Sequence, residues 1–277
     1  MSTAILQRVA QFGPASARRS DRIFYSCLIV ALVGMIVVGS GSNYYFRLFS
    51  DPPVFTRLVA LHVATCNAWL ALLLAQTTLI SAGQGHVHRW LGMLGAFIAA
   101  AFVVLAYLAS IDSIRRGFHP VPGPPANVFF AILLRGVLVF AAVIGAALYF
   151  RRDPETHKRL ILIGTIAALL PATVGRLAGE HQWINALVTL MFLAASPLYD
   201  KWSRGRVHPV NRWTPWVVFA TSPLSALVGT TAMWDSIVAW LASMTSWARR
   251  SSPAITSASG GSSSYSSPSS PSFGFDR

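Results

Sequence analysis

LHVATCNAWLALLLAQTTLISAGQGHVHRWLGML, residues 61–94, indicates the fold of this chain most clearly. It predicts two apolar helices joined by a short turn, because the apolar runs on either side have about the 20 residues that cross a hydrocarbon core. His62 lies inside the first helix, and His86 and His88 lie where the second begins. The stretch therefore places titratable groups in and beside a membrane.

The composition of the whole chain is that of a membrane protein. Its 277 residues are 54% hydrophobic and only 11% charged, whereas a soluble domain carries roughly a quarter charged residues. The net charge of +13 comes from Lys and Arg in short clusters between apolar blocks. Anionic headgroups and the positive-inside rule account for such clusters, so the predicted partner is the lipid bilayer and not nucleic acid. Cys27 and Cys66 fall inside apolar blocks and are interpreted as small packing residues.

An all-α transmembrane bundle of about seven spans is predicted. Residues 1–22 form a basic cytoplasmic leader, residues 23–244 the helical bundle, and residues 245–277 a disordered Ser-rich tail. The expected spans are 23–46, 56–82, 90–111, 128–150, 160–177, 183–199 and a last apolar region, 215–244.

Prolines mark the points where regular helix is expected to stop or bend. Residues 111–127 contain enough Pro and Gly to forbid a regular helix, and Pro154 is expected to break the fourth span. Pro171 and Pro197 lie in short spans, which are either kinked helices or broken helices that line a site. The last apolar region is either one tilted span or a span followed by an interfacial helix.

The distribution of positive charge predicts the orientation. With the amino end in the cytoplasm, thirteen Lys and Arg residues fall on the cytoplasmic side and five on the other. Cytoplasmic loops carry the excess of such residues, so the amino end is expected inside. Only Arg249 and Arg250, after the last apolar region, would then lie outside against the rule.

Three polar residues are expected in or near the outer half of the membrane. His62 and Arg135 lie at similar depth within their spans, and Asp112 comes at the outer surface. An intramembrane His or Arg is costly enough to be a functional candidate. These residues either line an outward cavity that binds a solute or only fix helix packing.

Histidines also gather on the cytoplasmic side. His86, His88 and His157 sit at helix starts, and His208 lies in the last inner loop. Neutral imidazoles on facing helices can hold a haem iron axially, so His88 and His157, together with His62, are candidate ligands for haem b or a quinone. Pairs of histidines at both membrane faces resemble the layout of two-haem cytochromes of the b561 type. No nearby thiolate or carboxylate completes a metal site at His86 and His88.

Several blocks of the chain resemble a family of uncharacterised bacterial inner-membrane proteins with about seven spans. The blocks are DRIFY, YYFRLF, residues 61–92 with HRWLG, residues 151–177 with HKRL, YDKWSRGRVHP and TTAMWDSIVAWL. The resemblance implies the fold and a bacterial inner-membrane location, and it implies no activity. It implies that the family's motif positions are His62, His88, Arg89, His157, Lys158, Arg159 and His208. Arg135 lies outside the blocks.

Three functional hypotheses remain open at this point. The first is a redox module with haem b or a quinone at His88 and His157, with His62 as a further ligand. The second is a small-solute permease lined by His62, Arg135 and Asp112, and the third is an accessory protein. No sequence motif places a nucleophile beside a base, so whether the chain is an enzyme is undecided, and its oligomeric state is not predicted.

Overall fold

The computed structural model describes residues 14–41, 45, 56–115 and 125–250, and within these ranges it is helical without a strand. The helices are α2 (Pro14–Ser40), α4 (Arg57–Ser81), α5 (Gly85–Arg115), α6 (Ala126–Tyr149), α7 (Pro154–Ala178), α8 (Gln182–Arg204), α9 (Pro209–Gly229) and α10 (Ala232–Arg250). The predicted all-α class is therefore confirmed.

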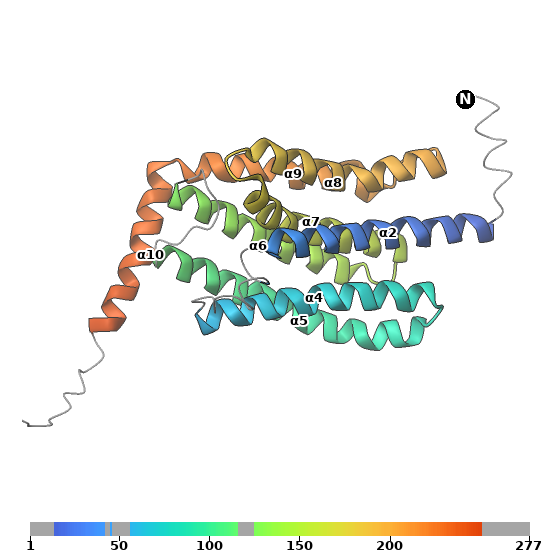
Figure 1. The fold of residues 1–277 in the computed structure, drawn as a ribbon, viewed down its shortest axis with the longest axis horizontal. Coiled ribbons are helices and arrows are strands. Elements are labelled where there is room, and N and C mark those ends of the chain that lie inside the picture. Colours follow the sequence, from blue (N-terminus) through green and yellow to red (C-terminus); the bar gives the residue numbers. More distant parts are fainter. Residues whose placement is uncertain (1–13, 42–44, 46–55, 116–124, 251–277) are drawn as a thin grey trace, which may run out of the picture.

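The helices make a polytopic membrane bundle. Among the described residues six helices are long and apolar enough to cross a bilayer, and α9 with the first part of α10 makes a seventh candidate span that is bent by 80°. Figure 1 shows the start of α2 and the α4–α5 turn at one end of the bundle, while α10 runs across the other. The first is called the cytoplasmic end, after the predicted orientation, and the second the outer end.

The start of α7 shows how local chemistry sets a helix boundary. Pro154 is the first residue of α7, and Asp153 caps it by accepting hydrogen bonds from the backbone N–H groups of Glu155 (3.1 Å) and Thr156 (3.4 Å). A hydrogen bond from the Thr156 side chain, together with these two backbone bonds, holds the pKa of Asp153 below its ordinary value. The sequence had suggested Pro154 as a helix breaker, but a proline at the first helical position lacks only an N–H that would have no partner there.

Other boundaries also differ from the prediction. Helix α5 continues to Arg115, four residues beyond the expected end at residue 111, because the prolines of that segment begin only at Pro120. Helix α2 begins at Pro14, within the expected leader, and α7 and α8 run continuously through Pro171 and Pro197. Residues 46–55, 116–124 and most of the predicted tail, 251–277, lie outside the described residues.

Helix α7 is the centre of the bundle. It packs against α2, α6, α8 and α9, and most of its side chains are buried. Close approach to α2 depends on Gly39, where an added Cβ would lie 2.8 Å from the carbonyl oxygen of Thr173. Helix α4 packs mainly on α5 and α2 instead. Across the wider space between α4 and α7, the indole N–H of Trp69 donates to Thr165 Oγ1 at 3.2 Å.

Candidate functional site

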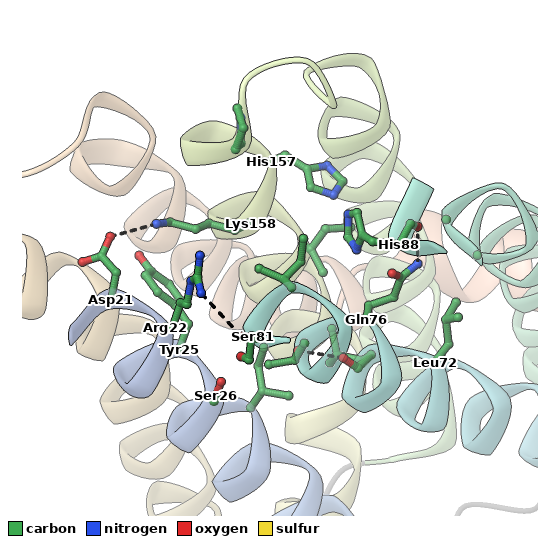
Figure 2. A pocket seen from close by; sticks show the side chains of 18 of the residues that line it. Asp21, Arg22, Tyr25, Ser26, Leu72, Gln76, Ser81, His88, His157 and Lys158 are labelled. Carbon is green, nitrogen blue, oxygen red and sulfur yellow. Dashed lines mark hydrogen bonds and ion pairs between the residues drawn. The ribbon is translucent and has the colours of Figure 1, made fainter. Parts of the chain in front are cut away.

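A cavity of about 340 Å³ opens among α2, α4, α5 and α7 near the cytoplasmic end. Most of its wall is apolar, and a few polar side chains converge on it, as Figure 2 shows. The apolar wall is built by Ile29, Trp69, Leu72, Leu73, Leu148 and Ile161. A concave, mainly apolar site with a small polar set is the usual form of a small-molecule site.

Two histidines from different helices meet in this cavity. His88 comes from the first turn of α5 and His157 from the first turn of α7, and Figure 2 shows their rings next to each other. His157 Nδ1 lies 2.8 Å from the carbonyl oxygen of Ala147. Because a carbonyl only accepts, Nδ1 carries the hydrogen and His157 Nε2 is left with a lone pair.

Two buried polar atoms beside the histidines lack a hydrogen-bond partner. They are His88 Nδ1 and Gln76 Oε1, neither of which has a partner among the residues that the structure describes. The amide nitrogen of Gln76 donates to the backbone carbonyl of His88 at 3.2 Å, so the Gln76 side chain is fixed to the start of α5. Unpaired buried polar atoms are costly, and both residues line the cavity.

Charged side chains surround the cytoplasmic mouth. Lys158 Nζ donates to Asp21 Oδ2 at 3.1 Å, which joins α7 to α2, and to Glu155 Oε1 at 2.7 Å within α7. Arg22 Nη1 lies 3.4 Å from the carbonyl oxygen of Ser81, at the end of α4. The mouth is therefore polar and bears both signs of charge, while the interior of the cavity is apolar.

A fully buried ion pair lies directly behind the mouth. The side chains of Arg159 on α7 and Asp200 on α8 both have zero exposure, and they pair through two hydrogen bonds, one of them Nε to Oδ2 at 3.1 Å. Arg159 also reaches Glu155 Oε2 at 2.7 Å, which connects the pair to the cavity wall. Asp200 accepts further hydrogen bonds from Asn211 Nδ2 (2.7 Å) and the backbone N–H of His208 (3.2 Å).

The sequence indicated one half of this pair and missed the other. Arg159 and His208 were family motif positions, whereas Asp200 was read as the start of a loop. Helix α8 continues to Arg204, so Asp200 lies within a helix that faces α7. The sequence feature that could have identified Asp200 is its position as an acidic residue directly after an apolar run.

His208 caps α9. Its Nδ1 accepts from the backbone N–H of Val210 at 3.3 Å, which requires that this nitrogen be unprotonated. Burial, and then the positive charge of Arg159, lowers the pKa of His208 below its ordinary value. The neutral imidazole is thus the form that the fold requires.

The candidate residues of the outer half each contact different partners. Arg135 donates to Thr221 Oγ1 at 2.9 Å and to the carbonyl oxygen of Val218 at 3.4 Å, both on α9. Asp112 Oδ2 accepts from Thr56 Oγ1 at 3.2 Å, where α4 begins. No described contact joins either residue to His62.

His62 lies near the outer end of α4 and does not meet His88 or His157, which lie at the cytoplasmic end. Its ring packs on Phe102 with centroids 5.5 Å apart. Within the described ranges, no group of three or more His, Cys, Asp or Glu residues could hold a metal ion.

The fold is that of a polytopic helical membrane bundle with a largely apolar cavity near one end. Comparisons of the chain with protein-family models, curated proteins and solved structures find no match. The resemblance to the seven-span family and to b561-type cytochromes therefore stays a prediction.

Proposed function

We propose that this protein is an integral protein of a bacterial inner membrane and belongs to a redox system. It binds the head ring of a quinone in the cavity beside His88 and His157. The observation that carries the proposal is the pair of unpartnered buried atoms, His88 Nδ1 and Gln76 Oε1, on the wall of an apolar cavity. The inner-membrane location rests on the family resemblance and on the charge bias of the loops.

A quinone matches this wall in both polarity and shape. Its ring carries carbonyl oxygens that accept hydrogen bonds when oxidised and hydroxyl groups that donate them when reduced. A hydrogen on His88 Nδ1 would bond a carbonyl, and Gln76 Oε1 would accept from a hydroxyl. The apolar residues of the wall, among them Leu72 and Ile161, would cover the ring and the start of an isoprenoid tail.

The neighbouring residues suit proton exchange at the head ring. His157 keeps its Nε2 lone pair directed away from the carbonyl of Ala147, so this nitrogen can take and return a proton. Glu155 and Lys158 at the mouth connect the site to the cytoplasmic side. When bound, a quinone would supply the electron chemistry, and the chain would hold the ring and exchange protons with it.

Haem b is the second candidate, favoured by one observation. A histidine that ligates a metal usually donates its other ring N–H to a carbonyl or carboxylate, as His157 does to Ala147. His88 Nδ1 makes no such orienting bond, since it has no partner among the described residues. The same atom suits a donor to a quinone oxygen, so the quinone is the better fit.

The test measures quinone binding to the detergent-purified protein. Titration with a short-tailed quinone, followed by quenching of tryptophan fluorescence, should give saturable binding because Trp69 lines the cavity. Replacement of His88 by alanine should weaken binding by about tenfold or more, the effect of losing roughly 1.4 kcal/mol. His86→Ala is the matched control, because the His86 side chain is exposed and, among the described residues, bonds only to Trp90.

An absorption spectrum separates the two candidates. A Soret band with sharp reduced α and β bands that disappears in both His88→Ala and His157→Ala would favour haem over the quinone. A folded, colourless protein whose quinone binding is absent, or is the same in the His88 and His86 variants, would refute the proposed site.

A further inference from the structure

Helix α10 turns away from α9 at nearly a right angle. It follows α9 after Thr230 and Thr231, with a bend of 80° between the two helices, and Figure 1 shows it running across the outer end of the bundle. Helix α9 alone is long enough to cross the membrane, because its 21 residues extend about 31 Å and a hydrocarbon core is about 30 Å thick. Helix α10 is therefore free to lie along the membrane surface.

The contacts of α10 with the bundle place it at the depth of that surface. Trp234 stacks on Phe130 with ring centroids 5.4 Å apart, and its indole N–H donates to the carbonyl oxygen of Asn127 at 2.8 Å. Ile111 belongs to the same buried cluster. Ile111 and Phe130 each lie about one helical turn, ~6 Å, from the outer ends of α5 and α6. Helix α5 has 31 residues, about 46 Å, which matches a bilayer with its headgroups, so this depth is where headgroups meet acyl chains.

Helix α10 has three different sides. The side that packs on the bundle carries Trp234, Val238 and Leu241. The second side carries large apolar residues that are exposed in the structure, namely Met233 (69%), Ile237 (39%) and Trp240 (56%). The third side is small or polar and carries Asp235, Ser236, Ala239 and Ser243.

The order of these sides around the helix suits a position at the edge of the bundle. At 3.6 residues per turn, Ile237 is about 100° from Val238 and about 200° from Ala239. The exposed apolar side is thus next to the side that packs on protein and opposite the polar side. Trp240 adds to this pattern, since tryptophan concentrates at membrane–water interfaces. One side of α10 then faces protein, the next lipid and the third water.

Positive charge at the end of α10 complements an anionic surface. The helix ends with Arg249 and Arg250, which the sequence analysis placed on the outer side against the positive-inside rule. Basic residues strengthen the binding of an interfacial helix, because anionic headgroups attract them. The spans under α10 also expose large apolar side chains, Val104 on α5 and Leu138 on α6 among them. Lipid therefore matches both the charge of α10 and the surface beside it.

We infer that α10 is an interfacial helix that binds the outer leaflet of the membrane through the side formed by Met233, Ile237 and Trp240. These side chains lie among the upper parts of the acyl chains, and the polar side faces water. The partner is a lipid surface with anionic headgroups. This inference does not depend on quinone binding.

Site-directed spin labelling of the full chain tests this placement. Cys27→Ser and Cys66→Ser remove the two native thiols, and a nitroxide is attached in the variant Ile237→Cys or in the variant Ala239→Cys. The protein is placed in vesicles of phosphatidylcholine and phosphatidylglycerol. Oxygen concentrates among acyl chains, whereas a nickel chelate stays in water. We expect the ratio of oxygen to nickel collisions to be severalfold higher at position 237 than at position 239.

Three results would overturn the inference. Low ratios at both positions would place the exposed apolar side in water. High ratios at both would place α10 wholly within the hydrocarbon core, as the second half of a span. Low collision rates with both reagents at position 237, together with dipolar broadening between labels, would show that a second copy of the chain covers this side.

Vesicle composition tests the anionic headgroup separately. The ratio at position 237 should fall in vesicles of phosphatidylcholine alone, and it should fall in the mixed vesicles when Arg249→Gln and Arg250→Gln are combined, because both changes remove the charge attraction. A ratio that stays the same in both cases would overturn the anionic part of the inference.

Aspartate substitutions test the same placement without replacing the cysteines. Ile237→Asp would put a charge among acyl chains and should lower the melting temperature of the protein by several degrees, because a charge in hydrocarbon is costly. Ala239→Asp lies on the polar side and should leave the melting temperature nearly unchanged. Equal shifts in the two variants would contradict a lipid-facing side at Ile237.

Discussion

Replacement of Asp200 by alanine is expected to cost more stability than any single exposed charge. The carboxylate is fully buried and accepts hydrogen bonds from Arg159, Asn211 and the backbone of His208. Alanine removes all of these acceptors together. The guanidinium of Arg159 stays buried, with Glu155 as its remaining hydrogen-bond partner among the described residues.

The size of the effect follows from these contacts. Removing one partner of a buried ion pair costs about 3–5 kcal/mol, because the other charge is left without compensation. The remaining bond from Arg159 to Glu155 reduces this cost. The Asn211 amide keeps its bond to Ser196 but loses its second acceptor, which adds about 1–3 kcal/mol. We therefore expect Asp200→Ala to lower the free energy of unfolding by about 3–5 kcal/mol.

Reversible unfolding in mixed micelles of neutral detergent and dodecyl sulfate, followed by circular dichroism, measures this change. Arg204→Gln is the control, because Arg204 is 32% exposed and pairs with Asp21 and Glu155, so about 0–1 kcal/mol is expected. Asp200→Asn keeps an oxygen acceptor but loses the charge and should fall between the two. A cost for Asp200→Ala no larger than that for Arg204→Gln would refute the reasoning.

Two further predictions concern packing and pH. Gly39→Ala should destabilise the α2–α7 contact and lower the melting temperature, since its Cβ would meet the backbone oxygen of Thr173 at 2.8 Å. Gly34→Ala, with nothing within 4 Å of the added atom, should be tolerated, and equal effects of the two would contradict the packing argument. His208 has a lowered pKa, so the unfolded chain binds its proton more readily. Its contribution to stability is therefore full above the ordinary pKa of about 6.5 and is lost as the pH falls below it. His208→Asn, which can still cap α9, should flatten the melting temperature between pH 7 and 5, and an unchanged slope would count against this cause.

The buried ion pair and the cavity are mechanically connected. Glu155 forms part of the cavity wall and bonds to Lys158, Arg159 and Arg204. The network thereby fixes the first turn of α7, which also carries His157. We expect changes at Asp200 to disturb the cavity through this turn, without any direct contact with a bound ligand.

The amino-acid sequence alone was enough to predict the helices and their insertion into a membrane. Apolar runs such as residues 61–81 are local features, and their length against the thickness of a bilayer is enough to predict a span. The boundaries between helices were harder to predict from sequence, because a proline such as Pro154 can either end one helix or begin the next. That choice depended on Asp153, whose side chain caps α7.

Which polar residues come into contact is known only from the packing of the helices in the structure. His88 and His157 line one cavity, Arg159 pairs with Asp200, and His62 packs on Phe102. Spans that are apolar on nearly every side carry little periodic signal of which face turns inward. Helix order and rotation are fixed by packing among all the helices, so the pairing of residues far apart in the chain is a property of the assembled bundle.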